Sequence, residues 1–212
     1  MSTRRVYIEK ILRQIYGGYP TDDSEITFNL VNVWLNEGIA AAAHQNYNES
    51  IKVDGVSYIN NSFYTTFNDI SFSKDSLFVY SATLPQVPVG LGKNEGINDL
   101  RFKMPDGSYS YSAIPLSQNQ KGYSDMLPPV PNKIMYWYEG NMLYAKSTLP
   151  LNTMLTKTTM VSGGDSSNLD SIINVPEDYF DFITQYIDRN LMLSRNQPVD
   201  AQNDGADHVR IT

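Results

Sequence analysis

Several kinds of residue and segment are missing from this 212-residue sequence, and each absence narrows what the chain can be. It contains no cysteine, which excludes disulfide bonds, thiolate chemistry and zinc sites built on cysteine. No apolar run approaches the ~18 residues that a membrane-spanning helix needs. The opening MSTRRVYIEK passes directly into a charged amphipathic pattern rather than the apolar core of a signal peptide. We therefore expect a protein that is made and used in a cytoplasm, or exported only as part of a larger particle.

Clustered positive charge is also missing. The formal net charge is −7, and the sixteen Lys and Arg residues are scattered along the chain, apart from the adjacent pair Arg4 and Arg5. Proteins that bind nucleic acids without sequence preference rely on grouped cations that displace counterions from the phosphates. The composition therefore argues against a nucleic-acid-binding protein of that kind.

Residues that commonly perform catalysis are scarce. Only two histidines occur: His44 follows an alanine run within a predicted helix, and His208 lies in a polar tail. Neither position offers the fixed geometry that general acid–base catalysis requires. We therefore expect no enzymatic activity.

Two short motifs resemble ligand sites but lack essential residues. GLGKNEG has Val87 and Asn94 where a phosphate-binding loop needs a glycine and a serine or threonine. DAQNDGAD begins like a calcium-binding loop, but Ile211 occupies the position of the closing carboxylate. The sequence thus predicts neither a cofactor nor a metal ion.

Helix-forming sequence occupies the N-terminal quarter of the chain. Between Thr3 and Tyr16, apolar residues recur at helical spacing until Gly17 and Gly18 end the pattern. A second helix of about 22–25 residues is predicted to begin at the capping box of Asp22 and Glu25. Its expected apolar face consists of Ile26, Leu30, Val33 and Trp34.

From residue 49 to residue 167 the pattern changes to alternating apolar and polar residues with turn signals between them. We predict an antiparallel sheet, either a small barrel or a sandwich, with turns at 54–55, 73–76, 105–107 and 139–141. The second of these turns is expected to join strands within 62–67 and 77–82.

Two irregular stretches, 84–97 and 117–132, interrupt the predicted strands. Loops of this length are uncommon inside a compact domain unless they bind something. We expect them to contact neighbouring molecules, through Leu91, Tyr123, Met126, Leu127 and Pro128.

The C-terminal segment combines a helix with a polar tail. Pro176 stands at a plausible first helical position, and the apolar stripe that follows ends near Arg195. The tail after it has no periodic apolar face and cannot bury itself on its own molecule. Its expected partner contacts are Pro198, Val199, Asp200, Asn203, Asp204, Val209 and Ile211.

These segments together predict an α+β protein. Residues 1–48 form an N-terminal helical hairpin, 49–167 a β-rich insertion, 168–196 a C-terminal helix that completes a helical collar, and 197–212 an extended arm. The fifteen tyrosines suit half-hydrated contact surfaces, because the ring is apolar and the hydroxyl polar. We therefore expect a component of an assembly.

The ending VPEDYFDFITQYIDRNLMLSRNQPVDAQNDG resembles that of head-to-tail connector ring proteins, also called tail adaptors, of short-tailed bacteriophages, most closely those of crAss-like viruses. The opening is similar as well: a short helix, a Gly-Gly break and a longer amphipathic helix. The resemblance covers residues 1–47 and 173–212. It implies a virion structural protein that links the portal to the tail, in a homo-oligomeric ring of about twelve copies.

The same resemblance implies the protein's partners and location. The ring would contact the portal and adjacent tail rings at the head–tail junction, after synthesis in the host cytoplasm. The arm of each copy would lie on a neighbouring ring or on the portal. DNA would pass through the channel without specific binding, and no membrane would be involved.

An alternative function is a receptor- or carbohydrate-binding module of a tail fibre, because the β-rich middle carries the aromatic run Tyr136-Trp137-Tyr138. Its residues alternate between sheet faces, so that either Trp137 or its neighbours point inward, and core packing is favoured over a sugar platform. A ring subunit should be monomeric when isolated, with a protease-sensitive tail, whereas a fibre module should form stable trimers. An enzyme such as a cell-wall hydrolase is the least supported function.

Overall fold

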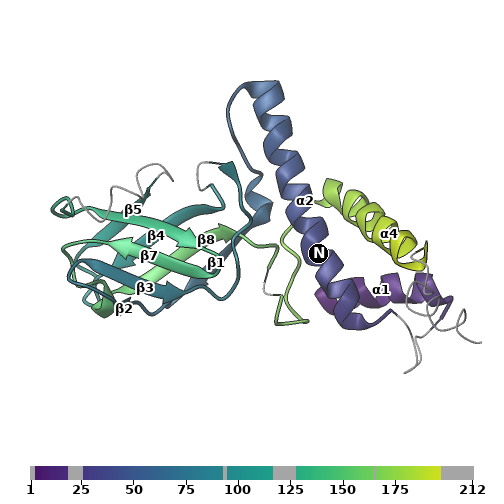
Figure 1. The fold of residues 1–212 in the computed structure, drawn as a ribbon, viewed down its shortest axis with the longest axis horizontal. Helices are drawn as coiled ribbons and strands as arrows, with labels where there is room; N and C mark the ends of the chain where they lie inside the picture. Colours follow the sequence, from purple (N-terminus) through teal and green to yellow (C-terminus); the bar gives the residue numbers. More distant parts are fainter. Residues whose placement is uncertain (1–2, 19–25, 93–94, 117–127, 165, 197–212) are drawn as a thin grey trace, which may run out of the picture.

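The computed structural model describes residues 3–18, 26–92, 95–116, 128–164 and 166–196. It has the expected α+β architecture, with helices from both ends of the chain and a curled sheet, a half-barrel, from the middle (Figure 1). We call the group of α1 (Arg4–Tyr16), α2 (Phe28–Asp54) and α4 (Phe180–Asn196) the helical lobe. The strands from residue 64 to residue 161 form the β lobe.

Helix α1 agrees with the sequence prediction at both ends. The Thr3 side chain accepts a hydrogen bond from the Val6 N–H, which caps the first turn. Gly17 ends the helix with φ at 64°, in the left-handed region that glycine adopts at little cost. Tyr7, Ile8, Ile11 and Leu12 face the core.

The predicted start of α2 was wrong. The helix begins at Phe28, where the Thr27 hydroxyl caps it by accepting from the Leu30 N–H. Asp22 and Glu25, the expected capping box, lie outside the described residues. Val33, expected on the apolar face, is about half exposed, because it follows the buried Val31 by two positions and so points away from the core.

The predicted end of α2 was also wrong, since the helix continues through the expected strand residues 51–53 and ends where a hairpin turn was expected, at Asp54–Gly55. Gly55 is its C-terminal cap, with φ at 68° and its N–H bonded to the Ile51 carbonyl. The Ser50 hydroxyl bonds to both the Tyr47 and Tyr58 carbonyls, so that the chain after the cap folds back along the helix. β-branched residues in 51–56 favoured a strand locally, but continued helical hydrogen bonding prevailed.

The β lobe is one eight-stranded sheet in the order β1-β8-β4-β5-β6-β7-β3-β2. The strands are β1 (Tyr64–Asn68), β2 (Ser73–Lys74), β3 (Val79–Thr83), β4 (Ile97–Lys103), β5 (Ser110–Pro115), β6 (Ile134–Glu139), β7 (Met142–Lys146) and β8 (Leu155–Val161). The predicted hairpins at 105–107 and 139–141 are confirmed as β4–β5 and β6–β7. The predicted hairpin at 73–76 was wrong, because β1 pairs with β8, and residues 73–74 themselves form β2 beside β3.

One strand pair departs from the expected antiparallel pattern. β5 and β6 run parallel, with Ala113 beside Ile134 and Pro115 beside Tyr136. Parallel neighbours need a crossover connection of a dozen or more residues. The long stretch around 117–132, interpreted from sequence as a contact loop, therefore has a topological reason for its length.

Two hydrophobic clusters fill the two lobes. The β-lobe cluster draws only on residues between 67 and 160. The helical cluster combines α1, α2 and α4 with Ile26, Ile173 and Val175 from the segments that lead into α2 and α4. It also includes four buried residues from segments that flank or enter the sheet: Ile59, Phe63, Leu91 and Val161. The Phe63 ring, just before β1, meets Tyr179 edge-on with centroids 5.5 Å apart. The two lobes are thus interlocked, because side chains in and just before the β lobe are part of the helical core.

The segment after β8 fastens the start of α1. Arg4 is fully buried and donates to Asn32 Oδ1 at 2.8 Å and to the Gly163 carbonyl at 3.4 Å. The Arg4 N–H donates to the Ser171 carbonyl, and the Arg5 N–H to the Leu169 carbonyl. Because Asn32 belongs to α2, this cluster joins three separate stretches of chain.

The C-terminal helix agrees closely with its prediction. A single 3-10 turn at Glu177–Tyr179 leads from Pro176 into α4. Ile183 and Ile187 are fully buried, and α4 crosses α2 closely at Gly38, where an added Cβ would lie 3.1 Å from Ile183 Cγ2. Leu193, near the end of the helix, is exposed.

Candidate interaction surfaces

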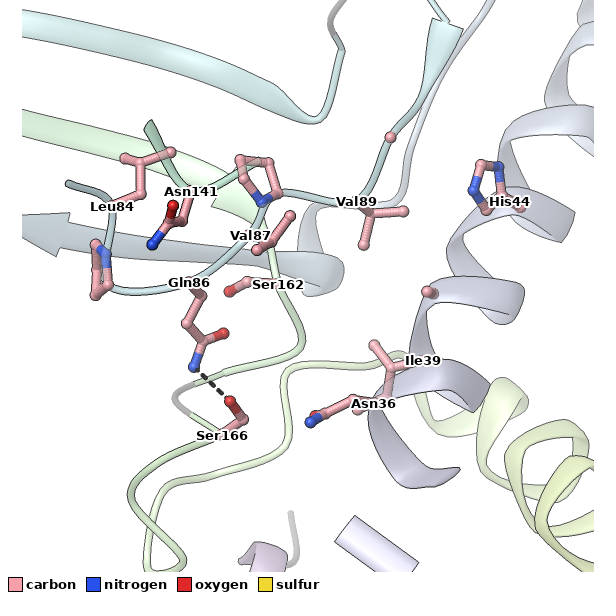
Figure 2. Close-up of a pocket in the computed structure, with 14 residues that line it drawn as sticks. Asn36, Ile39, His44, Leu84, Gln86, Val87, Val89, Asn141, Ser162 and Ser166 are labelled. Atoms are coloured by element: carbon pink, nitrogen blue, oxygen red, sulfur yellow. Dashed lines mark hydrogen bonds between the residues drawn. The ribbon is translucent and has the colours of Figure 1, made fainter. Parts of the chain in front are cut away.

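A cleft of about 570 Å³ separates the helical lobe from the β lobe. Figure 2 shows Asn36, Ile39 and His44 of α2 on one side, and the chain between Leu84 and Val89 on the other. Ser162 and Ser166, which follow β8, lie between these two sides. The cleft is therefore bounded by both lobes.

The chemistry of this cleft is neutral and suited to hydrogen bonding. Gln86 Nε2 donates to Ser166 Oγ at 3.3 Å (Figure 2). Among the described residues that line it, His44 is the one titratable side chain, and it is exposed on α2 away from the amide and hydroxyl groups. Side chains of this kind can hold amide or backbone groups but do not form an acid–base pair.

The aromatic run on β6 is oriented by the sheet. Tyr136 faces the β-lobe core, where burial raises the pKa of its hydroxyl, and that hydroxyl donates to the Ile97 carbonyl at 3.2 Å. Trp137 lies on the opposite face, stacked on Tyr144 with ring centroids 5.4 Å apart, and is only 9% exposed. Of the two orientations left open by the sequence, the neighbours point inward. Trp137 is not an open platform for a sugar ring.

A second opening, the β notch, lies where β4 begins and β5 ends. Its volume is about 360 Å³, and Tyr58, Tyr64 and Tyr136 contribute to its lining. Glu95 also lines it, and its Oε1 accepts a hydrogen bond from Ser57 Oγ at 2.7 Å. The notch therefore combines aromatic surface with one carboxylate.

The far end of α2 carries the largest group of exposed apolar residues that are close in sequence. We call Ile51, Val53, Val56 and Tyr58 the α2 tip; Val53 is 82% exposed and Val56 is 64% exposed. Figure 1 shows this end of α2 rising beyond both α4 and the β lobe. Exposed apolar patches on soluble proteins commonly mark interaction sites. Sequence reasoning missed this surface, because the β-branched residues were assigned to a strand.

A polar link fixes the start of α4 against α2. The Tyr179 hydroxyl donates to Glu49 Oε2 at 2.9 Å and accepts from Asn46 Nδ2 at 3.2 Å. Hydrogen bonds from Gln45 and from Tyr179 lower the pKa of Glu49 below its ordinary value. The link holds α4 beside the half of α2 that leads to the α2 tip.

The predicted contact residues have different outcomes. Pro128 is exposed, and its role as a contact residue stays a prediction. Leu91 is buried in the helical cluster, so that its assignment as a surface contact is corrected: the loop that carries it folds inward against α2. The other candidates lie outside the described residues: Tyr123, Met126, Leu127, Pro198, Val199, Asp200, Asn203, Asp204, Val209 and Ile211.

Two properties of the described residues bear on the class of protein. Within the described ranges, none of the helices combines the length and the apolar character needed to cross a bilayer. The same ranges contain no group of three or more His, Asp or Glu side chains placed to hold a metal ion. No protein-family model matches the chain, and no curated protein sequence matches it.

Proposed function

We propose that this protein is a virion structural protein, a head-to-tail connector ring subunit that links the portal to the tail around the genome-ejection channel. One observation carries the proposal: the two chain ends that bear the resemblance pack against each other as one helical lobe, with the β lobe inserted between them. A helical lobe of this kind can form the wall of a ring, while the insertion projects from it.

The α2 tip supports the assembly part of the proposal. Four apolar residues stand at or just beyond the end of a helix that projects past the rest of the molecule, and each is between 41% and 82% exposed. Burial of such residues against other copies would release about 25 cal/mol for each Å² of apolar surface. A subunit of a ring gains this burial at every interface.

The charge of the protein suits a channel through which DNA moves. With a net charge of −7, the ring would repel the phosphate backbone rather than hold it. DNA would then pass without specific binding. Tight, salt-sensitive DNA binding by the purified ring would contradict this part of the proposal.

The fibre module is less well supported. Its main evidence was the aromatic run on β6, and the stacked, almost fully covered Trp137 offers no open sugar-binding face. An enzyme is supported least, because the interlobe cleft lacks a pair of acid–base groups among its described residues.

The proposal is tested by locating the protein in virions. In particles assembled with a tagged copy as the sole source of this protein, labelling should appear at the head–tail junction. Labelling at fibre tips would favour the fibre module, and absence from particles would overturn the proposal.

The role of the α2 tip is tested in the same particles. V53D and V56D should each reduce incorporation at least about tenfold, which corresponds to ~1.4 kcal/mol of lost contact energy. L77D is the matched control, because Leu77 is 71% exposed but lies on the β lobe. It should be incorporated normally. Equal loss for all three variants would show that the α2 tip has no special role.

A further inference from the structure

The β notch arises because two neighbouring strands diverge. β4 pairs with β8 from Ile97 to Lys103, but it pairs with β5 only from Arg101 to Lys103. β5 then leaves β4 and joins β6 over Ala113 to Pro115. The first half of β4 consequently has a strand partner along one edge only, and its other edge faces the notch.

The backbone at this edge is directed into the notch. The Gly96 carbonyl accepts from the Val161 N–H at 2.9 Å, on the β8 side. The next carbonyl, that of Ile97, turns to the other side and accepts from the Tyr136 hydroxyl at 3.2 Å. The Tyr136 hydroxyl thus donates the hydrogen bond that a neighbouring strand would otherwise donate to the Ile97 carbonyl. An edge of this kind is a template for an added strand.

We propose that the β notch receives the end of the C-terminal arm of a second copy of this chain, as a strand beside β4. This inference deepens the proposed ring function and rests on it for the presence of a neighbouring copy. The arm ends in HVRIT, in which the β-branched residues Val209 and Ile211 alternate with polar residues, the pattern of a strand with one apolar face.

The chemistry of the notch matches that pattern. Tyr58, Ala113 and Pro115, which are exposed or partly exposed, offer apolar surface to an added strand. Glu95 lies in the same lining, bonded to Ser57, and within the described part of the chain no lysine or arginine pairs with it. Glu95 stands in the turn before β4, outside the alternation of that strand, and Arg210 on the polar face of the added strand supplies the complementary charge.

The direction of α4 favours a second copy over the same molecule. Figure 1 shows α4 ending on the side of the helical lobe that faces away from the β lobe. The arm begins there, sixteen residues from the C-terminus. An arm that starts on that side has to pass the helical lobe before it reaches the notch of its own molecule.

The absence of cysteine from the chain makes disulfide cross-linking a clean test. Full-length A113C and full-length I211C are mixed under mild oxidation at about 1 mM, the effective concentration that a tethered neighbour provides. The mixture should form a 113–211 heterodimer. The yield of this heterodimer should be about tenfold higher than the yield from S112C mixed with I211C. Residue 112 points to the opposite face of β5, and a disulfide needs Cβ atoms within ~4.5 Å.

A charge exchange gives a second readout on the same cross-link. E95R in the A113C protein should lower its yield, R210E in the I211C protein should do the same, and the two together should restore it. Equal yields for residues 112 and 113, or no heterodimer, would overturn the proposal. A monomer closed by an internal disulfide in the A113C/I211C double variant would overturn the second copy as the occupant.

The outcome of the cross-linking test is independent of the outcome of the localisation test. A protein found at the head–tail junction that gives no 113–211 heterodimer keeps its ring function and loses the strand exchange. If the heterodimer forms but the protein is absent from the head–tail junction, the strand exchange is supported and the proposed ring function is contradicted.

Discussion

The helical lobe and the β lobe are built in opposite ways. The β lobe comes from one continuous run of chain, and its hydrophobic cluster contains only residues of that run. The helical lobe comes from both ends of the chain and completes its cluster with Ile59, Phe63, Leu91 and Val161 from around the sheet. The structural dependence between the lobes therefore runs one way. The hydrophobic core of the helical lobe needs residues from around the sheet, whereas the core of the β lobe is complete without the helices.

The most severe test of this one-way dependence uses two phenylalanines that are both fully buried. Phe63→Ala should cost about 3–5 kcal/mol in the helical lobe, because it opens a cavity beside Tyr179. Phe102→Ala should lower the stability of the β lobe by a similar amount, and the helical lobe should unfold together with the β lobe.

Each lobe carries one of the chain's two tryptophans, which allows the two unfolding transitions to be measured separately. Trp34 reports on the helical lobe in a W137F background, and Trp137 reports on the β lobe in a W34F background. Urea titrations should show that Phe63→Ala lowers the Trp34 midpoint more than the Trp137 midpoint. Equal shifts in both would mean that the lobes unfold as a single unit and that the comparison is wrong.

A smaller effect is expected where the two lobes touch at a glycine. Gly163 has φ at 66°, and a Cβ there would lie 2.6 Å from Ile39 Cγ2. Gly163→Ala should therefore destabilise the protein by about 2–4 kcal/mol, from backbone strain and overpacking together. The measurement is the free energy of unfolding from urea titration.

Gly17 provides the matched control for the steric part of this effect. Its φ is 64°, but nothing lies within 4 Å of the position that a Cβ would occupy. Gly17→Ala should cost only the strain, about 1–2 kcal/mol. If the two variants lose the same stability, the close approach of Gly163 to Ile39 does not hold the lobes together.

The smallest expected effect is a gain of stability confined to the β lobe. Thr158 is fully buried, and its hydroxyl has no hydrogen-bond partner among the described residues. Thr158→Val should raise the free energy of unfolding by about 1–2 kcal/mol, because it removes an unsatisfied polar atom while it keeps the branched shape. The Trp137 midpoint should move upward.

The neighbouring residue separates this cause from a general preference for valine in a strand. Thr159 Oγ1 lies 3.1 Å from Thr66 Oγ1, so that its hydroxyl has a partner. Thr159→Val should give no gain or a small loss. A comparable gain at both positions would assign the stabilisation to β propensity instead.

Features encoded in neighbouring residues could be predicted. The start of α1 at Thr3, its end at Gly17 and the hairpin around Gly140 were all visible, because caps and two-residue turns depend on side chains a few positions apart. The start of α2 was misplaced because the Asp22–Glu25 pair matches a capping box, whereas Thr27 caps the helix in the structure. Its end was misplaced because the β-branched residues around Val53 suit a strand as well as an exposed helix.

The interaction surfaces were harder to predict than the elements. Leu91 looked like a loop contact and is buried, while Val53 and Val56 looked like strand residues and form the exposed α2 tip. Whether an apolar residue is covered depends on chain segments far away in sequence, and a single sequence does not reveal which segments those are.

The order of residues alone settled the class of the fold: helices at the two ends and strands between them. Only the folded chain decided that Phe63 enters the helical cluster, that β5 leaves β4 for a parallel partner, and that the β notch opens between them. The reason is physical. Helix periodicity and turns arise from contacts within a few residues, whereas strand pairing and cavities arise from packing between segments that the chain brings together from a distance.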